Sequence, residues 1–403
     1  MQKENYMKKL LALCLAGLLA VAGISVFAGC SDDDGTVKVG FIALHDKNST
    51  YDKNFIEAIE QVCKEKNVTL DLRTGIPEND TCYQTACELA DDGCDVIFAD
   101  SFSHEQFVVR AAKEYPKVQF CHATGVTGHT GEVKNFHNAF ASIYEGRYLA
   151  GVAAGMKLKE MDAAGTLKGQ KDSNGNIKIG YVGAYPYAEV ISGYTAFYLG
   201  AKSIVENLIM DVEFTGSWND QTKEKETATT LITNGAALIS QHADSLGAPS
   251  ACEEKGVPNV AYNGNTSETC PETYLVATRI NWVPYFEYMI DCVLEGEEID
   301  YDWCGTLATG SVVVESLGKN AAEGTQAKLD EVKAKLMSGE LHVFDCSKFT
   351  VGGQTISSAL ADIDGDYTAE TQVVEDGIYY ESKFRSAPYF DLKIDGINAH
   401  TDN

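Results

Sequence analysis

Two kinds of hydrophobic pattern alternate along the chain after its first 36 residues. Short runs of β-branched and apolar residues are typical of buried strands, and longer segments with apolar residues at helical spacing are typical of amphipathic helices. The first part of this pattern predicts strands at 37–44, 68–73, 94–100 and 117–123, and helices at 53–66, 78–93 and 104–116. Regular alternation of strand and helix predicts a parallel sheet with helices on both faces.

The same alternation then begins again after a helix rich in small residues and a polar loop. The second part predicts helices at 145–161, 187–206, 221–234 and 245–255, a loop at 169–176, and strands at 177–183, 208–214, 236–242 and 258–264. A Lys/Glu/Ala helix at 320–338 and then short strands with Gly/Asp turns form a different tail. The fold class is therefore α/β, with two doubly wound parallel-sheet domains around a cleft.

The pattern also suggests where the domains begin and end. We expect an N-terminal α/β lobe at 37–145, with a crossover segment near 275–310, and a C-terminal α/β lobe at 146–274. Residues 311–403 would be an extension that completes or decorates the lobes. No charge-rich or Pro-rich linker separates the two α/β units.

The first 30 residues carry a targeting signal. Lys8 and Lys9 precede an apolar run that ends in small residues before Cys30, which is the pattern of a secretory signal. "FAGC" is similar to a bacterial lipobox, so we expect a signal peptide at 1–29, lipidation of Cys30 and a linker at 30–36. An ordinary signal peptide and an uncleaved anchor stay open as alternatives. The expected location is extracytoplasmic, with the lipid anchored to the outer face of the cell membrane.

Charge and cysteine content narrow the class further. The 403 residues carry a formal net charge of −27, which argues against nucleic acid and against an anionic lipid surface as partners. The acidity is compatible with a soluble monomer. The sequence has 12 cysteines but no CxxC pair, so zinc-ribbon and thioredoxin interpretations fail. Buried free cysteines and a disulfide such as Cys252 with Cys270 both stay open.

Aromatic and hydrogen-bonding residues gather where the predicted strands end. Ligands of open α/β sheets bind beyond the carboxyl ends of the strands, so these positions are candidate contacts. The candidates are Tyr51, Asp52, Ser101, Phe102, His122, Glu189, Trp218, Asn219, Asp244, Asn263 and Trp282. Rings that sandwich a ligand and carboxylates that read its edge suit a neutral planar heterocycle. No Walker loop or GxGxxG is present, and few Lys or Arg residues stand at these ends.

Each candidate also has a structural interpretation. Asp52, Asp220 and Ser245 stand at predicted helix starts, where they would serve as caps. Trp218 would fit a domain core, and His122 and His242 would fit as structural histidines.

Five segments carry a resemblance to a known family. They are "HATG" (122–125), "YEGRYLAGVAAG" (144–155), "YAEVISGYTAFYLGAKSI" (187–204), "SWND" (217–220) and "SQHADS" (240–245). In order and spacing the chain resembles the basic membrane protein family of substrate-binding lipoproteins of ABC transporters, in its purine-binding branch. The resemblance covers roughly 37–315 and implies the type I periplasmic-binding-protein fold.

The resemblance also implies roles for individual residues. Trp218 would stack on a purine base, Asp244 would accept from its ring N–H or amino group, and Glu189 would read a second edge. Phe102 would form an apolar wall, and His242 would only brace the turn. Where the wider family has "DKSFN" this chain has "NSTYD", so Tyr51 and Asp52 would take those places. That departure puts recognition of a ribose in doubt.

Three hypotheses follow for the function. The first is a solute-binding lipoprotein that delivers a purine base or nucleoside to the permease and ATPase of an ABC importer. The second is a surface sensor or regulator with the same fold. Within the first hypothesis, a different small solute is an alternative to the purine. The third, an enzyme, is disfavoured because no GxSxG elbow and no metal-ligand spacing occur. "DIDGD" (362–366) resembles the start of a calcium loop but has no Gly at the sixth position and no Glu at the twelfth, and we expect no cofactor and no metal.

Overall fold

The computed structural model describes residues 36–167 and 169–400, and the structural statements below concern those residues. The described residues from Val37 onward form one compact unit. The expected signal peptide and Cys30 lie outside the described residues. Within the described ranges, no helix combines the length and the apolar character needed to cross a membrane.

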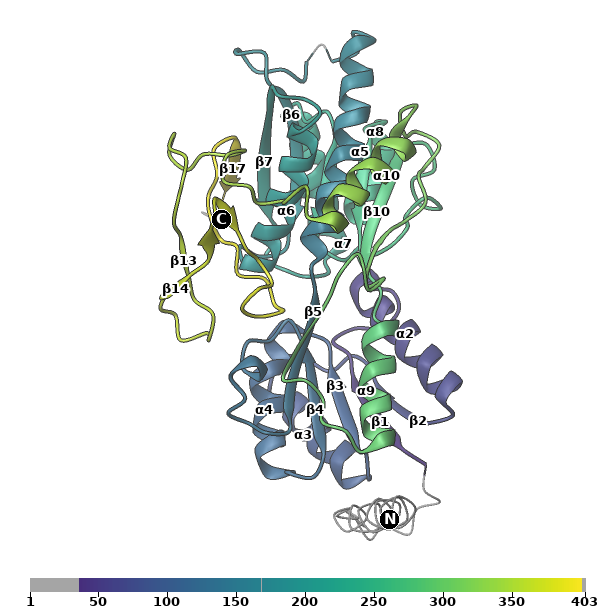
Figure 1. Ribbon diagram of the computed structural model, residues 1–403. Helices are drawn as coiled ribbons and strands as arrows, with labels where there is room; N and C mark the ends of the chain where they lie inside the picture. The colour runs from purple at the N-terminus through teal and green to yellow at the C-terminus, as the bar shows by residue number, and fades with distance from the viewer. Residues whose placement is uncertain (1–35, 168, 401–403) are drawn as a thin grey trace, which may run out of the picture. The chain divides into compact units, whose positions relative to one another are not determined.

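The first lobe is built on a six-stranded sheet in the order β11-β5-β4-β3-β1-β2, and its strand pairs are parallel (Figure 1). Its strands are β1 (Lys38–Ile42), β2 (Thr69–Arg73), β3 (Val96–Ala99), β4 (Gln119–Ala123), β5 (Phe136–Ala141) and β11 (Asp302–Gly305). Its helices are α2 (Thr50–Lys66), α3 (Asp80–Asp91), α4 (Glu105–Glu114) and α9 (Val283–Glu295), with short 3-10 turns at Phe102–His104 and Gly128–Thr130.

Both faces of this sheet are covered. Consecutive residues of a strand point to opposite faces, so each strand contributes side chains to two cores. Val96 and Phe98 of β3 belong to a core with residues of α2 and α9, and Ile97 belongs to a second core with residues of α3 and α4. Burial on both faces explains why β1 and β3 are so apolar.

The second lobe is built on a seven-stranded sheet in the order β12-β10-β9-β8-β6-β7-β17, parallel except where β12 pairs with β10. Its strands are β6 (Ile177–Gly183), β7 (Leu208–Phe214), β8 (Ile239–His242), β9 (Asn259–Tyr262), β10 (Tyr274–Ile280), β12 (Val312–Val314) and β17 (Ile397–His400). Its helices are α5 (Ile143–Ala163), α6 (Ala188–Lys202), α7 (Gln221–Thr233) and α8 (Gly247–Lys255).

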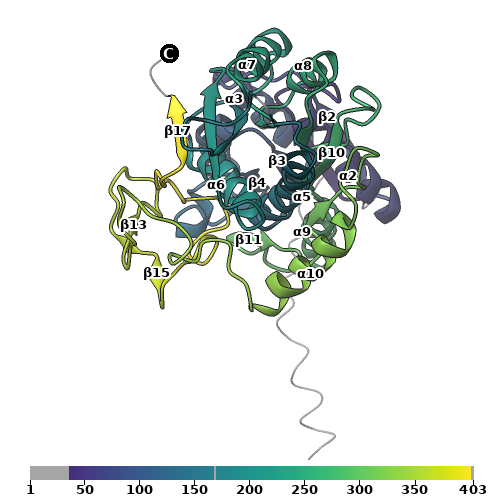
Figure 2. The same cartoon turned by 90° about the horizontal axis from the view of Figure 1, so that it is seen from above.

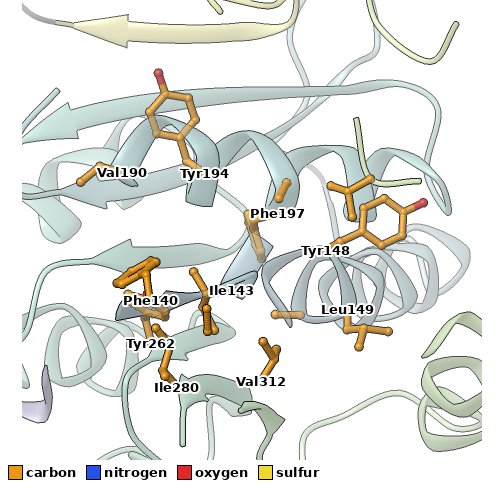
Figure 3. Packing of buried hydrophobic residues seen from close by; sticks show 14 of the residues in the cluster. Phe140, Ile143, Tyr148, Leu149, Val190, Tyr194, Phe197, Tyr262, Ile280 and Val312 are labelled. Atoms are coloured by element: carbon orange, nitrogen blue, oxygen red, sulfur yellow. The ribbon is translucent and has the colours of Figure 1, made fainter. Parts of the chain in front are cut away.

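Helices α5 and α6 pack closely on one face of the second sheet. A Cβ added at Gly151 would lie 2.0 Å from the Phe197 carbonyl oxygen, and one added at Gly200 would lie 2.0 Å from the Tyr148 carbonyl oxygen. The small residues of the two helices therefore let their backbones touch. Figure 3 shows Tyr148 and Phe197 among the apolar side chains packed around this contact.

The sequence pattern missed the elements that carry the chain between the two sheets. The chain passes from β5 to α5, from β10 to α9, and from β11 to β12, and none of β5, β10, β11, β12 and α9 was predicted. Strand β5 escaped because polar residues interrupt it. His137 pairs with Gln119 at 2.9 Å, and the side chain of Asn138 accepts from the Gly128 N–H at 2.5 Å, so both polar groups are satisfied in a buried strand.

The C-terminal segment lies beside the second sheet. It contains α10 (Thr325–Ser338), β13 (Leu360–Ala361), β14 (Thr371–Gln372), β15 (Val374–Glu375) and β16 (Ile378–Tyr379), and it ends in β17. Figures 1 and 2 show these hairpins next to β17, which pairs with β7. Glu381 accepts from the Ser192 hydroxyl of α6 at 2.5 Å, and the Ser386 N–H donates to Asp302 of β11 at 2.7 Å. The segment therefore bonds to elements of both sheets.

Candidate functional site

One cavity, whose empty space of about 370 Å³ includes part of the open solvent at its mouth, lies where strand ends of the two sheets meet. Its position agrees with the rule for open α/β sheets, since its walls follow the carboxyl ends of β1, β3, β6, β8 and β9. The walls are made by Leu44, His45, Tyr51, Asp52, Ser101, Phe102, Glu189, Trp218, His242, Asp244 and Asn263. Eight of these residues were candidates from the sequence, and no described residue of the walls is a Lys or an Arg.

The first lobe contributes Tyr51 and Asp52 through the first turn of α2. Ser49, not Asp52, caps this helix, because the Ser49 hydroxyl accepts from the Asp52 N–H at 3.3 Å. The Tyr51 hydroxyl donates to the Asp100 carbonyl at 2.8 Å, and its ring packs on Phe55 at 4.8 Å. The helix start thus fixes the Tyr51 ring along the cavity wall.

The Asp52 carboxylate holds the loop that follows β1. It accepts from the His45 N–H at 2.7 Å and lies 3.3 Å from His45 Nδ1. Burial raises the pKa of Asp52, but the hydrogen bonds from His45 and Ser49 outweigh it and leave this pKa below its usual range. The hydrogen bond to Asp52 correspondingly raises the pKa of His45. This pair orders the cavity wall.

The second lobe contributes Asp244 and Asn263, which are joined to each other. Both are buried, and the Asn263 amide donates to Asp244 Oδ1 at 3.1 Å. The Asp244 N–H donates to the Trp218 carbonyl at 2.8 Å, which ties the "SWND" and "HADS" turns together. Burial raises the pKa of Asp244 well above its usual range, and the charges of Glu224, Asp52 and Glu189 add to the effect. An N–H donor on a ligand would stabilise the carboxylate form.

Glu189 and His242 form a second buried pair on the wall. Glu189 Oε1 lies 3.5 Å from His242 Nε2, and the His242 ring packs against Tyr262 at 4.4 Å. Burial lowers the pKa of His242, so the imidazole is neutral near pH 7, and within the described chain neither ring nitrogen has a hydrogen-bond partner. We expected His242 only to brace the turn, and this needs correction because His242 lines the cavity. Gln241 braces the turn instead, by donating to the carbonyls of Ala243 and Ser245.

A row of aromatic rings runs from one lobe to the other at the edge of the cavity. Phe102 stacks on Tyr187 at 5.3 Å, Tyr187 stacks on Tyr185 at 5.2 Å, and Trp218 meets Tyr185 edge-on at 5.2 Å. Phe102 and Tyr187 are 39 % and 41 % exposed, so the Phe102–Tyr187 pair faces solvent where the first and second lobes meet. Trp218 is half-buried and lines the cavity itself.

Three candidates do not line the cavity, and we withdraw them as ligand contacts. Trp282 is 1 % exposed and stacks on Phe55 at 4.2 Å, because it begins α9 and turns into the first-lobe core. His122 is fully buried beneath the site, where Nε2 pairs with the Ser101 carbonyl at 2.7 Å. Asn219 lies half-buried one residue beyond Trp218 and outside the walls.

Two supporting residues were missed by the sequence reasoning. Glu224 accepts from the Ser245 N–H and the Asp220 N–H, each at 3.2 Å, and burial raises its pKa to about 7. Glu224 therefore fixes the turn that carries Asp244. The sequence signal for this role was the position of Glu224 in the first turn of a helix that Asp220 caps.

The second is Arg147, which is fully buried in α5. It donates to Ser240 Oγ at 2.8 Å, the Tyr181 hydroxyl at 3.1 Å and the Ala261 carbonyl at 3.3 Å. A single charged residue within the small and apolar stretch 146–156 of α5 was the signal for a structural role beneath the strand ends.

Two other expectations concern cysteines and metals. Cys252 and Cys270 are free and buried, as are most described cysteines. In the C-terminal segment, carboxylate oxygens of Asp362, Asp364, Asp366 and Glu370 lie within 4.8 Å of one another on largely exposed side chains. Those carboxylates are far along the chain from the cavity walls and contribute none of them.

Comparisons with known proteins agree with this architecture. The family model described as "ABC transporter substrate-binding protein PnrA-like" matches residues 39–346. A purine-binding protein of Brucella abortus is 29 % identical over 81 % of this chain and 88 % of its own length. An ABC transporter nucleoside-binding protein of Lactococcus lactis is 27 % identical over 59 % of this chain and 67 % of its own length. A Haloferax volcanii protein, provisionally named an ABC transporter glucose-binding protein, is 29 % identical over 65 % of this chain and 62 % of its own length.

Solved structures support the fold. A solute-binding protein of an ABC transporter system from Conexibacter woesei superposes with a TM-score of 0.61 at 21 % identity, covering 76 % of this chain and 98 % of its own. A similar protein from Aeropyrum pernix gives a TM-score of 0.64 at 14 % identity, covering 79 % and 94 %. The predicted type I periplasmic-binding-protein fold is confirmed.

Proposed function

Because this chain belongs to the PnrA-like family of ABC transporter substrate-binding proteins, we propose that its cavity binds a purine base or nucleoside for import. Proteins of this family are extracytoplasmic, work with a permease and an ATPase, and are not enzymes. The family membership does not specify the ligand, and the purine is our proposal.

The pairing of Trp218 with Asp244 carries the proposal. The ring supplies a face for stacking, and the carboxylate supplies an acceptor for an N–H of the base. Both line a cavity whose described walls hold no Lys or Arg, so a phosphate-bearing nucleotide would find no counter-charge there. The name of the Brucella relative points the same way.

Calorimetry tests the ligand class. Adenine, guanine, hypoxanthine, xanthine and their nucleosides would be titrated into the purified protein, with glucose as the competing class suggested by the Haloferax name. We expect saturable binding of at least one purine and none of glucose. Trp218→Ala should weaken binding by about 5- to 150-fold, the range for one stacked base. Tyr367→Ala is the control, since this ring is 99 % exposed and is not among the residues of the cavity walls. Absence of any purine binding, or strong binding of glucose, would refute the ligand class.

We also propose that the mature protein is a monomer held at the membrane by lipid on Cys30. The "FAGC" sequence supports the lipid site, and the net charge of −27 is compatible with a monomer. Metabolic labelling with a radioactive fatty acid should mark the wild type and not Cys30→Ser, which should appear in the medium or periplasm. Equal labelling of both forms would contradict the lipid site.

A further inference from the structure

Hydrogen bonds from α2 cross from the first lobe to the second beside the cavity. The Thr50 N–H and the Thr50 hydroxyl both donate to the Asp244 carbonyl, each at 3.1 Å. One turn later, the Asn54 amide donates to the Asn263 carbonyl at 2.7 Å. Thr50 begins α2, so its N–H is one of the groups at a helix start without a partner inside the helix.

The acceptors of these bonds belong to residues that line the cavity. Asp244 and Asn263 present their side chains to the cavity wall and their main-chain carbonyls to α2. Their carbonyls are held in place from within the second lobe, because the Asp244 N–H donates to Trp218 and the Asn263 N–H donates to Thr278. Asn263 also has a φ of 62°, a left-handed conformation that this turn requires.

Neither donor lines the cavity. Thr50 and Asn54 instead border a second, wider groove together with Asn265 and Arg279, and among the described residues Asn263 lines both this groove and the cavity. The hydrogen bonds between the lobes therefore lie behind the side chains that line the cavity. There they can hold the lobes together without contacting the ligand.

We propose that Thr50 and Asn54 form a latch that keeps the two lobes closed on the ligand and so sets how long the ligand is retained. A ligand that orders Asp244 and Asn263 also orders the two carbonyls that the latch grips, which couples occupancy to closure. The proposal rests on the proposed function only in requiring that a solute occupies this cavity, whatever its identity.

Ligand release measured by stopped-flow fluorescence tests the latch. Asn54→Ala removes one crossing bond and Thr50→Val removes the hydroxyl bond while it keeps the N–H. One neutral hydrogen bond corresponds to about a 3- to 10-fold change. We expect each variant to release ligand about 3- to 10-fold faster, with the affinity ratios among ligands unchanged. Asn265→Ala is the matched control, because that amide donates to Ser316 within the second lobe.

Small-angle scattering of the ligand-free protein gives a second measurement that needs no ligand. The double variant Thr50→Val with Asn54→Ala should have a larger radius of gyration than the wild type, and Asn265→Ala should not. Unchanged release rates with unchanged scattering would overturn the latch, and altered affinity ratios would show that these residues contact ligand instead. If no purine binds but scattering changes as expected, the proposed ligand fails and the latch stands.

Discussion

Replacing Asp244 by Asn should make the ligand-free protein more stable and the ligand weaker. The wild-type carboxylate is buried, its pKa is raised by burial and by neighbouring negative charges, and no Lys or Arg is among the described residues that line the cavity. Asn keeps the shape and can still accept the hydrogen bond from Asn263. The substitution therefore removes a charge whose burial destabilises the folded protein. It also removes the charged acceptor that we propose for an N–H of the ligand.

The magnitudes follow from the hydrogen bonds involved. A hydrogen bond to a charged acceptor contributes about 1.5–3 kcal/mol, so the loss should weaken binding about 10- to 150-fold. The gain in stability should be about 1–2 kcal/mol at neutral pH, since the new amide also brings N–H groups that need partners. That gain corresponds to a rise of a few degrees in Tm.

The pH dependence distinguishes this mechanism from repacking. A raised pKa means that the contribution of Asp244 to stability is fully present below the usual Asp pKa of 3.8 and is lost as pH rises through the raised value. Asn does not titrate, so its advantage should be absent near pH 4 and present near pH 7. Thermal unfolding across this range, with calorimetry for binding, measures both effects.

Asp220→Asn is the matched control for this experiment. Asp220 caps α7 by accepting from the Lys223 N–H, and Asn caps about equally well, so neither stability nor affinity should change. A less stable Asp244→Asn protein, or one that binds as tightly as the wild type, would refute the reasoning.

Two further predictions concern the packing around the site. Gly200→Ala should destabilise the protein by about 2 kcal/mol or more in urea unfolding, because its Cβ would meet the Tyr148 carbonyl, whereas Gly169→Ala, where an added Cβ meets nothing, should not. Burial raises the pKa of Glu381 to about 8, so the wild type should lose stability between pH 4.5 and 8 by up to about 5 kcal/mol. Glu381→Gln should flatten that decline, and parallel curves for the two proteins would contradict it.

The sequence determined most of the strand ends from which the cavity walls are built, because the period of the hydrophobic pattern reports local structure. Runs of apolar residues gave the parallel strands, and the parallel arrangement placed Tyr51, Glu189, Trp218 and Asp244 at strand ends. The family resemblance then singled out Trp218 and Asp244.

Tertiary structure decided which strand ends share one cavity. Trp282 caps the start of α9, a helix that returns to the first lobe, so its ring packs into a core. His242 is the last residue of β8, and its side chain lines the cavity. The bonds from Thr50 and Asn54 join residues about 200 positions apart, as Thr50 with Asp244 shows. Periodicity describes contacts between neighbours along the chain, and contacts between lobes depend on where three crossovers bring the strands together.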